Sequence, residues 1–184
     1  GAQTAIGRAL LSSLAPRLHA GRIRLALVAG VRPEVAERFR SSIAEAGLAE
    51  GPTGQGEPGT VEVLFEPTIE DYFRRFHRLL AATDVLWTKP SELTFFAALG
   101  LPLVLTPPVG VQEYYNRRWV REHGAGLKQR NLHHAADWLD ELLDDGTLAN
   151  TAWSGFLRLP KFGLYRVLER VAPERGFDPC PSDP

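Results

Sequence analysis

Residues 84–116 read DVLWTKPSELTFFAALGLPLVLTPPVGVQEYYN. The segment DVLW, residues 84–87, predicts a β-strand, and the apolar periodicity of residues 91–99 predicts a helix that ends at Gly100. The run LPLVLT, residues 101–106, predicts a second strand. A strand, a helix and a strand in this order are typical of a βαβ unit, whose two strands are parallel.

The same alternation extends in both directions along the chain. Further strands are expected at residues 23–29 and 60–65, and further helices at 33–47, 69–80, 112–123, 131–144 and between 147 and 172. Because each strand is almost continuously apolar, we expect a parallel sheet covered on both faces. The predicted fold is a Rossmann-like α/β domain over residues 1–172, followed by a disordered tail at 173–184.

Composition excludes several classes of protein. The 184 residues are 44% hydrophobic and 23% charged, as in an ordinary soluble protein, and the net charge of −1 argues against nucleic-acid binding. No apolar run reaches the roughly 18 to 20 residues that a transmembrane helix needs. A lone cysteine, Cys180, permits no internal disulfide, and we expect a cytoplasmic protein. His133 and His134 lack a third ligand at suitable spacing, so no metal site is expected.

The first residues, GAQT, lie at the start of a predicted helix. Free backbone N–H groups at such a helix start suit phosphate, so Gly1, Ala2 and Gln3 are candidate phosphate-binding residues, although any loop before a helix favours small residues there. The chain contains no methionine, and no strand precedes this helix. We therefore expect the chain to be a piece of a longer protein.

The turn TKPSEL, residues 88–93, follows a predicted strand. In parallel α/β folds ligands bind at such carboxyl ends. Thr88 or Ser91 can cap the next helix, and Glu92 is favourable at its start, so capping alone accounts for part of the pattern. Lys89 is different, because a cation beside a helix N-terminus opposes the helix dipole. Its presence therefore needs a reason, such as an anionic ligand.

The loop PPVGVQEYYN, residues 107–116, offers the second group of polar side chains. Gln112, Glu113 and Asn116 fall in the first turn and a half of the expected helix, and the last two share a face. Carboxylate and amide groups of this kind suit the vicinal hydroxyls of a ribose or a hexose. The alternative is a capping arrangement with no ligand.

Residues 83–128 resemble the C-terminal, nucleotide-sugar-binding domain of GT-B glycosyltransferases, in particular the monogalactosyldiacylglycerol synthases and the N-acetylglucosaminyltransferases that form lipid II. These enzymes carry an ADxxITK strand and turn, a helix ending in GLP, a GQExxN or QQxxN cluster and a closing GAG. The matching residues here are Asp84, Thr88, Lys89, Gly100, Leu101, Pro102, Gln112, Glu113, Asn116, Gly124, Ala125 and Gly126.

The resemblance implies a role for each candidate residue. The donor diphosphate, of a UDP-like nucleotide sugar, would lie near Gly1–Gln3 and Thr88–Lys89, and the donor sugar near Gln112, Glu113 and Asn116. Phe65 and Glu66 would meet the nucleotide base. The implied activity is hexosyl transfer that inverts the sugar and needs neither metal nor cofactor, because Lys89 and the helix dipoles would stabilise the leaving diphosphate.

One position departs from the family pattern. The glutamate that holds the ribose hydroxyls in the family would fall at Phe95, and the loop before the helix is about two residues shorter by comparison of the motifs. Glu92 could take over the ribose, the donor could differ, or donor binding could be lost.

The resemblance also implies a partner that is missing from this chain, an N-terminal acceptor-binding domain. The catalytic base belongs to that domain in the family, so no catalytic residue is assigned here, and peripheral membrane contact would occur through the missing half. The alternatives to a glycosyltransferase are a non-catalytic interaction module and an epimerase or hydrolase of nucleotide sugars on the same scaffold.

Overall fold

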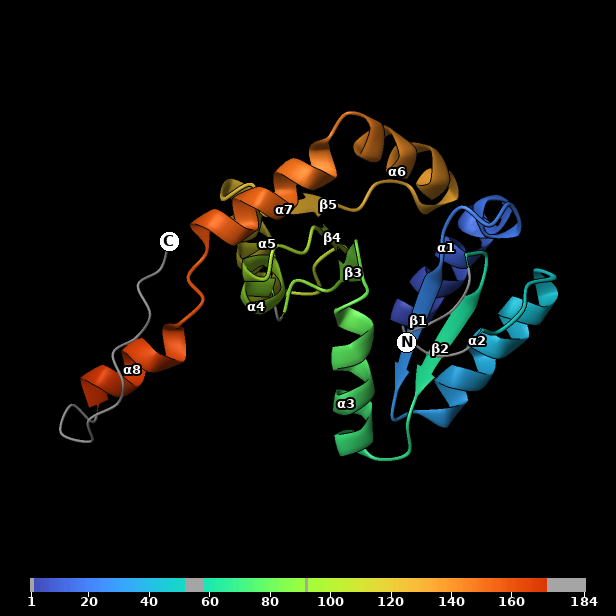
Figure 1. Cartoon of the computed structure of the whole chain (residues 1–184), viewed down its shortest axis with the longest axis horizontal. Helices are drawn as coiled ribbons and strands as arrows, with labels where there is room; N and C mark the ends of the chain where they lie inside the picture. Colours follow the sequence, from blue (N-terminus) through green and yellow to red (C-terminus); the bar gives the residue numbers. More distant parts are fainter. Residues whose placement is uncertain (1, 52–57, 92, 172–184) are drawn as a thin grey trace. The chain divides into compact units, whose positions relative to one another are not determined.

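All paired strands of the computed structural model are parallel within the described residues, which are 2–51, 58–91 and 93–171. The first sheet joins β1 (Leu25–Gly30) and β2 (Val61–Phe65), which lie side by side in Figure 1. The second has the order β3 (Leu86–Thr88), β4 (Leu103–Leu105) and β5 (Gly126–Lys128). The mixed α/β class with parallel strands is therefore confirmed.

The two sheets belong to two compact units. The first comprises Gly1–Thr83 and Arg130–Glu141, and the second comprises Asp84–Gln129 and Leu142–Pro184. The expectation of one domain over residues 1–172 stays a prediction. The expected tail, residues 173–184, lies outside the described residues.

The first unit packs three helices against β1 and β2, namely α1 (Ala2–His19), α2 (Pro33–Glu45) and α3 (Ile69–Leu80). The 3₁₀ helix η1 (Leu132–His134) contacts α1, and the first part of α6 (Ala135–Asp144) also belongs to this unit. Leu11 and Leu18 on α1 and Phe39 on α2 are buried, as are Val61 and Leu64 on β2. The burial of these apolar side chains is the main stabilising contribution in this unit.

In the second unit the central strand β4 is buried along its whole length. Leu103, Val104 and Leu105 are fully buried. The helices of this unit are α4 (Leu93–Ala98), α5 (Val111–Glu122), α7 (Thr147–Arg158) and α8 (Gly163–Val171), of which α4 contacts β4 and both α5 and α7 contact β5. Helix α4 contacts both α5 and α7.

The contact between α4 and α7 depends on a glycine. A Cβ atom on Gly155 of α7 would lie 2.4 Å from the carbonyl oxygen of Ala97 on α4. Only a residue without a side chain allows this approach of the two backbones. The close packing holds α4 against α7.

Candidate functional site

The two predicted ligand loops of the second unit meet at one edge of its sheet. Strand β3 ends at Thr88 and pairs in parallel with β4, which ends at Leu105, and these two residues are register partners. The backbone N–H of Thr106 donates to the carbonyl of Thr88 over 3.0 Å. The turn at 89–91 and the loop at 106–110 therefore leave the sheet next to each other, as the rule for parallel strands predicts.

A side chain joins the two loops directly. Asn116 on α5 donates from Nδ2 to the carbonyl oxygen of Pro90, 3.0 Å away. Pro90 is fully buried, and Asn116 is half-buried. The hydrogen bond holds the turn after β3 against the helix after β4.

A second side chain fixes the loop before α5. The carboxylate of Glu113 accepts from the backbone N–H of Val109 over 2.8 Å. Gly110 between them has φ 127° and ψ 172°, a conformation that is essentially restricted to glycine. Glu113 thus satisfies a backbone donor of a strained turn, which is the capping role that the sequence left open for it.

The remaining predicted residues of this edge differ in accessibility. Gln112 and Ser91 are exposed, while Thr88 and Lys89 are half-buried. Phe95, at the position of the family's ribose glutamate, is 60% exposed and lies edge-on to Phe96 with 5.5 Å between ring centroids. The Phe95 ring is therefore mostly uncovered, and Lys89, Ser91 and Gln112 are polar side chains of this edge that keep contact with solvent.

Other predicted site residues lie in the first unit or outside the described part of the chain. Gly1 and Glu92 lie outside the described residues, and nothing is described of the side chains of Ala2 and Gln3 beyond their place at the start of α1. Whether these residues serve a ligand stays a prediction.

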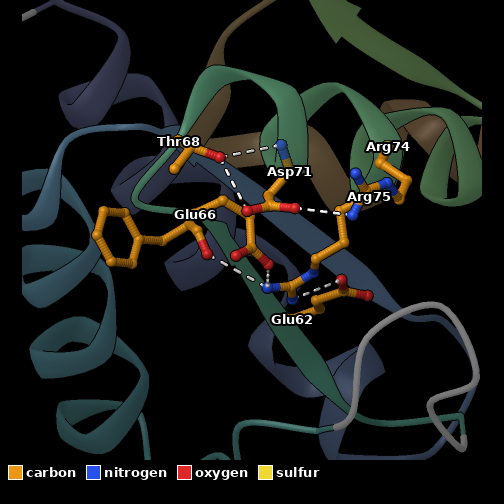
Figure 2. Close-up of polar contacts among 7 residues, drawn as sticks. Glu62, Glu66, Thr68, Asp71, Arg74 and Arg75 are labelled. Atoms are coloured by element: carbon orange, nitrogen blue, oxygen red, sulfur yellow. Dashed lines mark hydrogen bonds and ion pairs between the residues drawn. The ribbon is translucent and has the colours of Figure 1, made fainter.

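Phe65 ends β2, Glu66 follows it, and both belong to an ion-pair cluster in the first unit. Arg75 of α3 donates from Nη1 to the Phe65 carbonyl over 3.2 Å and to the Glu66 carboxylate over 2.6 Å. Its Nη2 lies 3.4 Å from the carboxylate of Glu62. Figure 2 shows the guanidinium of Arg75 between Glu62 and Glu66. The cluster joins the middle and the end of β2 to the helix that follows it.

The sequence analysis did not single out Arg75 or Glu62. The sequence contains a signal, because Glu62 is a carboxylate inside the otherwise apolar strand Val61–Phe65. In the structure its side chain is only 10% exposed. A buried carboxylate requires a paired cation or hydrogen-bond donors.

The start of α3 is also well defined. Thr68 accepts from the backbone N–H of Asp71 through Oγ1 over 3.2 Å, and Asp71 pairs with Arg74 over 2.8 Å. This N-cap fixes where the loop after β2 ends. Figure 2 shows Thr68, Asp71 and Arg74 beside the Arg75 cluster.

The pKa of Asp140 is shifted by an ion pair that joins two helices of the first unit. Arg17 of α1 lies with its Nε 3.0 Å from both carboxylate oxygens of Asp140 on α6, and its Nη2 also donates to Asp140. The hydrogen bond from Arg17 is the largest cause that lowers the pKa of Asp140 below its ordinary value. The pair joins the first and last helices of this unit.

Within residues 2–51, 58–91 and 93–171, no group of three or more His, Cys, Asp or Glu side chains is placed to hold a metal ion. None of the helices described is both long and apolar enough to cross a bilayer.

Comparison with known proteins yields a single family. Neither the curated proteins nor the solved structures contain a significant match to this chain. A family model described as a domain of unknown function, DUF6938, matches residues 1–172. The match covers most of the sequence, and the chain therefore belongs to the DUF6938 family.

Proposed function

We propose that this chain is the nucleotide-sugar-binding part of a glycosyltransferase of the GT-B type, with a UDP-sugar-like donor. The observation that carries the proposal is the hydrogen bond from Asn116 to the Pro90 carbonyl. It joins the two loops whose motifs resemble the donor-binding loops of that family, and it does so at the carboxyl edge of a parallel sheet.

The chemistry of this edge suits an anionic, hydroxyl-rich ligand. Lys89 supplies a cation beside the turn, and Gln112 supplies an exposed amide one helical turn away from Asn116. A fixed ammonium group stabilises the negative charge that grows on a leaving diphosphate. The amide of Gln112 has both a donor and an acceptor for sugar hydroxyls.

In this proposal Glu113 and Asn116 mainly shape the site. Glu113 accepts from the backbone N–H of Val109 through Oε2, and Asn116 donates from Nδ2 to the carbonyl of Pro90. The other carboxylate oxygen of Glu113 and the amide oxygen of Asn116 take no part in these two bonds. A donor sugar would bind to these remaining oxygens and to Gln112. The roles predicted for Gly1–Gln3, Phe65, Glu66 and Glu92 are not needed for this part of the proposal.

Calorimetric titration of the full chain with UDP, ADP and GDP tests the proposal. We expect UDP to bind, and Lys89→Ala to weaken binding roughly tenfold to a hundredfold, the usual contribution of a hydrogen bond to a charged group. Arg38→Ala, which removes an exposed cation from α2, is the matched control and should leave the affinity unchanged. An absence of binding at millimolar nucleotide, or equal affinities for Lys89→Ala and the parent chain, would refute the proposal.

A second candidate is a non-catalytic interaction module. It is favoured by Phe95, an exposed aromatic side chain at the place of the family's ribose glutamate, and by Leu99, which directly follows the end of α4 and is 54% exposed. A chain that binds none of the three nucleotides would support this candidate. Turnover of a nucleotide sugar without an acceptor would instead indicate an epimerase or hydrolase.

A further inference from the structure

Strand β5 brings one more charged residue to the edge of the sheet where the two predicted ligand loops meet. Lys128 is the last residue of β5 and is the register partner of Leu105, which is itself the register partner of Thr88. The three residues therefore lie in one row across the carboxyl ends of the parallel strands β3, β4 and β5. Lys128 was not among the predicted site residues, because the sequence did not predict the strand that it ends.

The side chain of Lys128 lies on the face of the sheet that α5 covers. Successive residues of a strand point to opposite faces, so Lys128 shares its face with Gly126. A Cβ atom on Gly126 would lie 2.6 Å from Val120 of α5, which identifies this face. Because α5 follows β4, its first turn, which contains Gln112, begins at the carboxyl edge. Lys128 and Gln112 thus belong to the same face and the same edge of the sheet.

The Lys128 side chain has no structural role in the part of the chain that the structure describes. It is exposed, and it makes no ion pair or hydrogen bond with the described residues. The ion pairs described for this chain use arginine or histidine instead. Among the 21 lysine and arginine residues, the lysines are Lys89, Lys128 and Lys161, and all others are arginines. Lysine is thus sparse in this chain, and both Lys89 and Lys128 lie at one edge of one sheet.

The spacing of the strands fits the length of a nucleotide sugar. Neighbouring strands lie about 4.8 Å apart, so the ends of β3 and β5 are separated by roughly 10 Å. In the proposed function the diphosphate lies beside Lys89, after β3, and the sugar lies beside Gln112, after β4. The end of β5 is then next to the part of the sugar that points away from the diphosphate. That end of a hexose ring carries the C4 and C6 groups.

We propose that Lys128 selects a donor whose sugar is a hexuronic acid, by binding the carboxylate at C6. The inference rests on the proposed function and adds the class of sugar to it. The ammonium group of a lysine, on its flexible four-carbon stem, pairs with a carboxylate as a point charge. A hydrogen bond between two charged groups is roughly twice as strong as one between neutral groups, so the pair favours a uronate over a hexose with a hydroxymethyl group at C6.

Calorimetric titration of the full chain with UDP-glucuronic acid and UDP-glucose tests the inference. The two donors differ only at C6, which is a carboxylate in the first and a hydroxymethyl group in the second. We expect the parent chain to bind UDP-glucuronic acid about fivefold more tightly, which is the upper range for an ion pair in contact with solvent. The preference should fall as the salt concentration rises, because salt screens an exposed pair.

Three variants separate the charge of Lys128 from other effects. Lys128→Gln removes the charge and keeps a polar side chain, so it should bind the two donors with nearly equal affinity. Lys128→Arg keeps the charge and should retain the preference. Arg121→Ala, which removes an exposed cation from the last turn of α5, is the matched control and should also retain it. Because these side chains are exposed, the variants should unfold at the same denaturant concentration as the parent chain.

Equal affinities of the parent chain for the two donors would overturn the inference, and so would an unchanged preference in Lys128→Gln. An equal loss of affinity for UDP and for UDP-glucuronic acid in Lys128→Gln would also overturn it, because the lysine would then act on the diphosphate. In each of these cases the parent chain still binds UDP, so the proposed function stands. No binding of UDP would refute the proposed function, and this inference with it.

Discussion

Asn116 on α5 donates a hydrogen bond over 3.0 Å to the carbonyl oxygen of Pro90, in the turn after β3. The two residues are 26 positions apart in the chain, and the bond joins two loops that leave neighbouring strands. Because Pro90 is buried, its carbonyl would otherwise need water or another donor. The first prediction follows from this bond.

Replacing Asn116 by alanine should destabilise the second unit by about 1 to 2 kcal/mol, because a buried carbonyl loses its donor. Chemical denaturation, followed by the fluorescence of Trp87 and Trp119 in this unit, measures the change. Asn150→Ala, at an exposed position on α7, is the control and should shift the midpoint by much less. Equal shifts for the two variants would show that the bond contributes nothing.

Glu113 and Gln112 are neighbours with different expected roles. Glu113→Ala should cost about 1 kcal/mol because the Val109 N–H loses its acceptor, whereas Glu113→Gln keeps an acceptor oxygen and should cost less. Gln112→Ala should leave stability unchanged, since the side chain is exposed.

Gln112→Ala should act on the ligand instead. If the proposed function holds, it should weaken binding of a UDP-sugar several-fold while the affinity for UDP is unchanged, because its amide faces the sugar in that proposal. Calorimetry with both ligands measures the difference. Equal weakening for UDP and the UDP-sugar would contradict a role in sugar binding.

The Arg75 cluster predicts non-additive effects of substitution. Arg75→Met should destabilise the first unit by about 3 kcal/mol, because it leaves the carboxylate of Glu62 buried without this partner. Adding Glu62→Gln removes the buried charge, so the double variant should recover much of the loss. A double variant that is as unstable as the sum of the two single variants would show that the two side chains are not coupled.

Two glycines give a matched pair of substitutions. Gly155→Ala should destabilise the second unit by about 2 kcal/mol or more, because the new Cβ would meet the backbone carbonyl of Ala97, which cannot move without displacing α4. Gly163→Ala, at the start of α8, has open space around the new Cβ and should have little effect. Thermal unfolding distinguishes the two, and similar melting temperatures would contradict the close packing of α4 and α7.

The sequence predicted the elements whose signals are local. Helix α3 matches its predicted bounds, 69–80, because Thr68 caps its start and the apolar residues keep a helical period. Strand β5 (Gly126–Lys128) was not predicted. Its three residues, GLK, contain no β-branched or aromatic residue, and the strand exists because its backbone pairs with β4.

For the candidate site, too, the sequence predicted only part of what the structure shows. The order of the motifs predicted which loops would meet, since the carboxyl ends of parallel strands share an edge. The sequence could not decide between ligand binding and capping for Glu113 and Asn116, because the same groups serve both. Only their distances to Val109 and Pro90 assign them to the turns.

The pair of Arg17 and Asp140 predicts a dependence of stability on pH. The hydrogen bond from Arg17 lowers the pKa of Asp140 in the folded chain relative to the unfolded chain. A lowered carboxyl pKa stabilises the fold at pH values above the unfolded pKa of about 3.9, and the contribution is lost as the pH falls through the folded value. The pair is partly exposed, with 20% and 40% of its side chains accessible, so solvent screening limits the contribution to about 0.5 to 1 kcal/mol at neutral pH.

Asp140→Asn should therefore lower the free energy of unfolding at pH 7 by that amount and have a smaller effect at pH 3, where the parent chain has begun to lose the ion pair. Urea denaturation at the two pH values measures the difference. Asp144→Asn changes an exposed carboxylate in the last turn of the same helix and is the control. Because a negative charge there opposes the helix dipole, that variant should be unchanged or slightly more stable at pH 7. A loss from Asp140→Asn that is equally large at both pH values would mean that Asp140 contributes through packing, not through its charge.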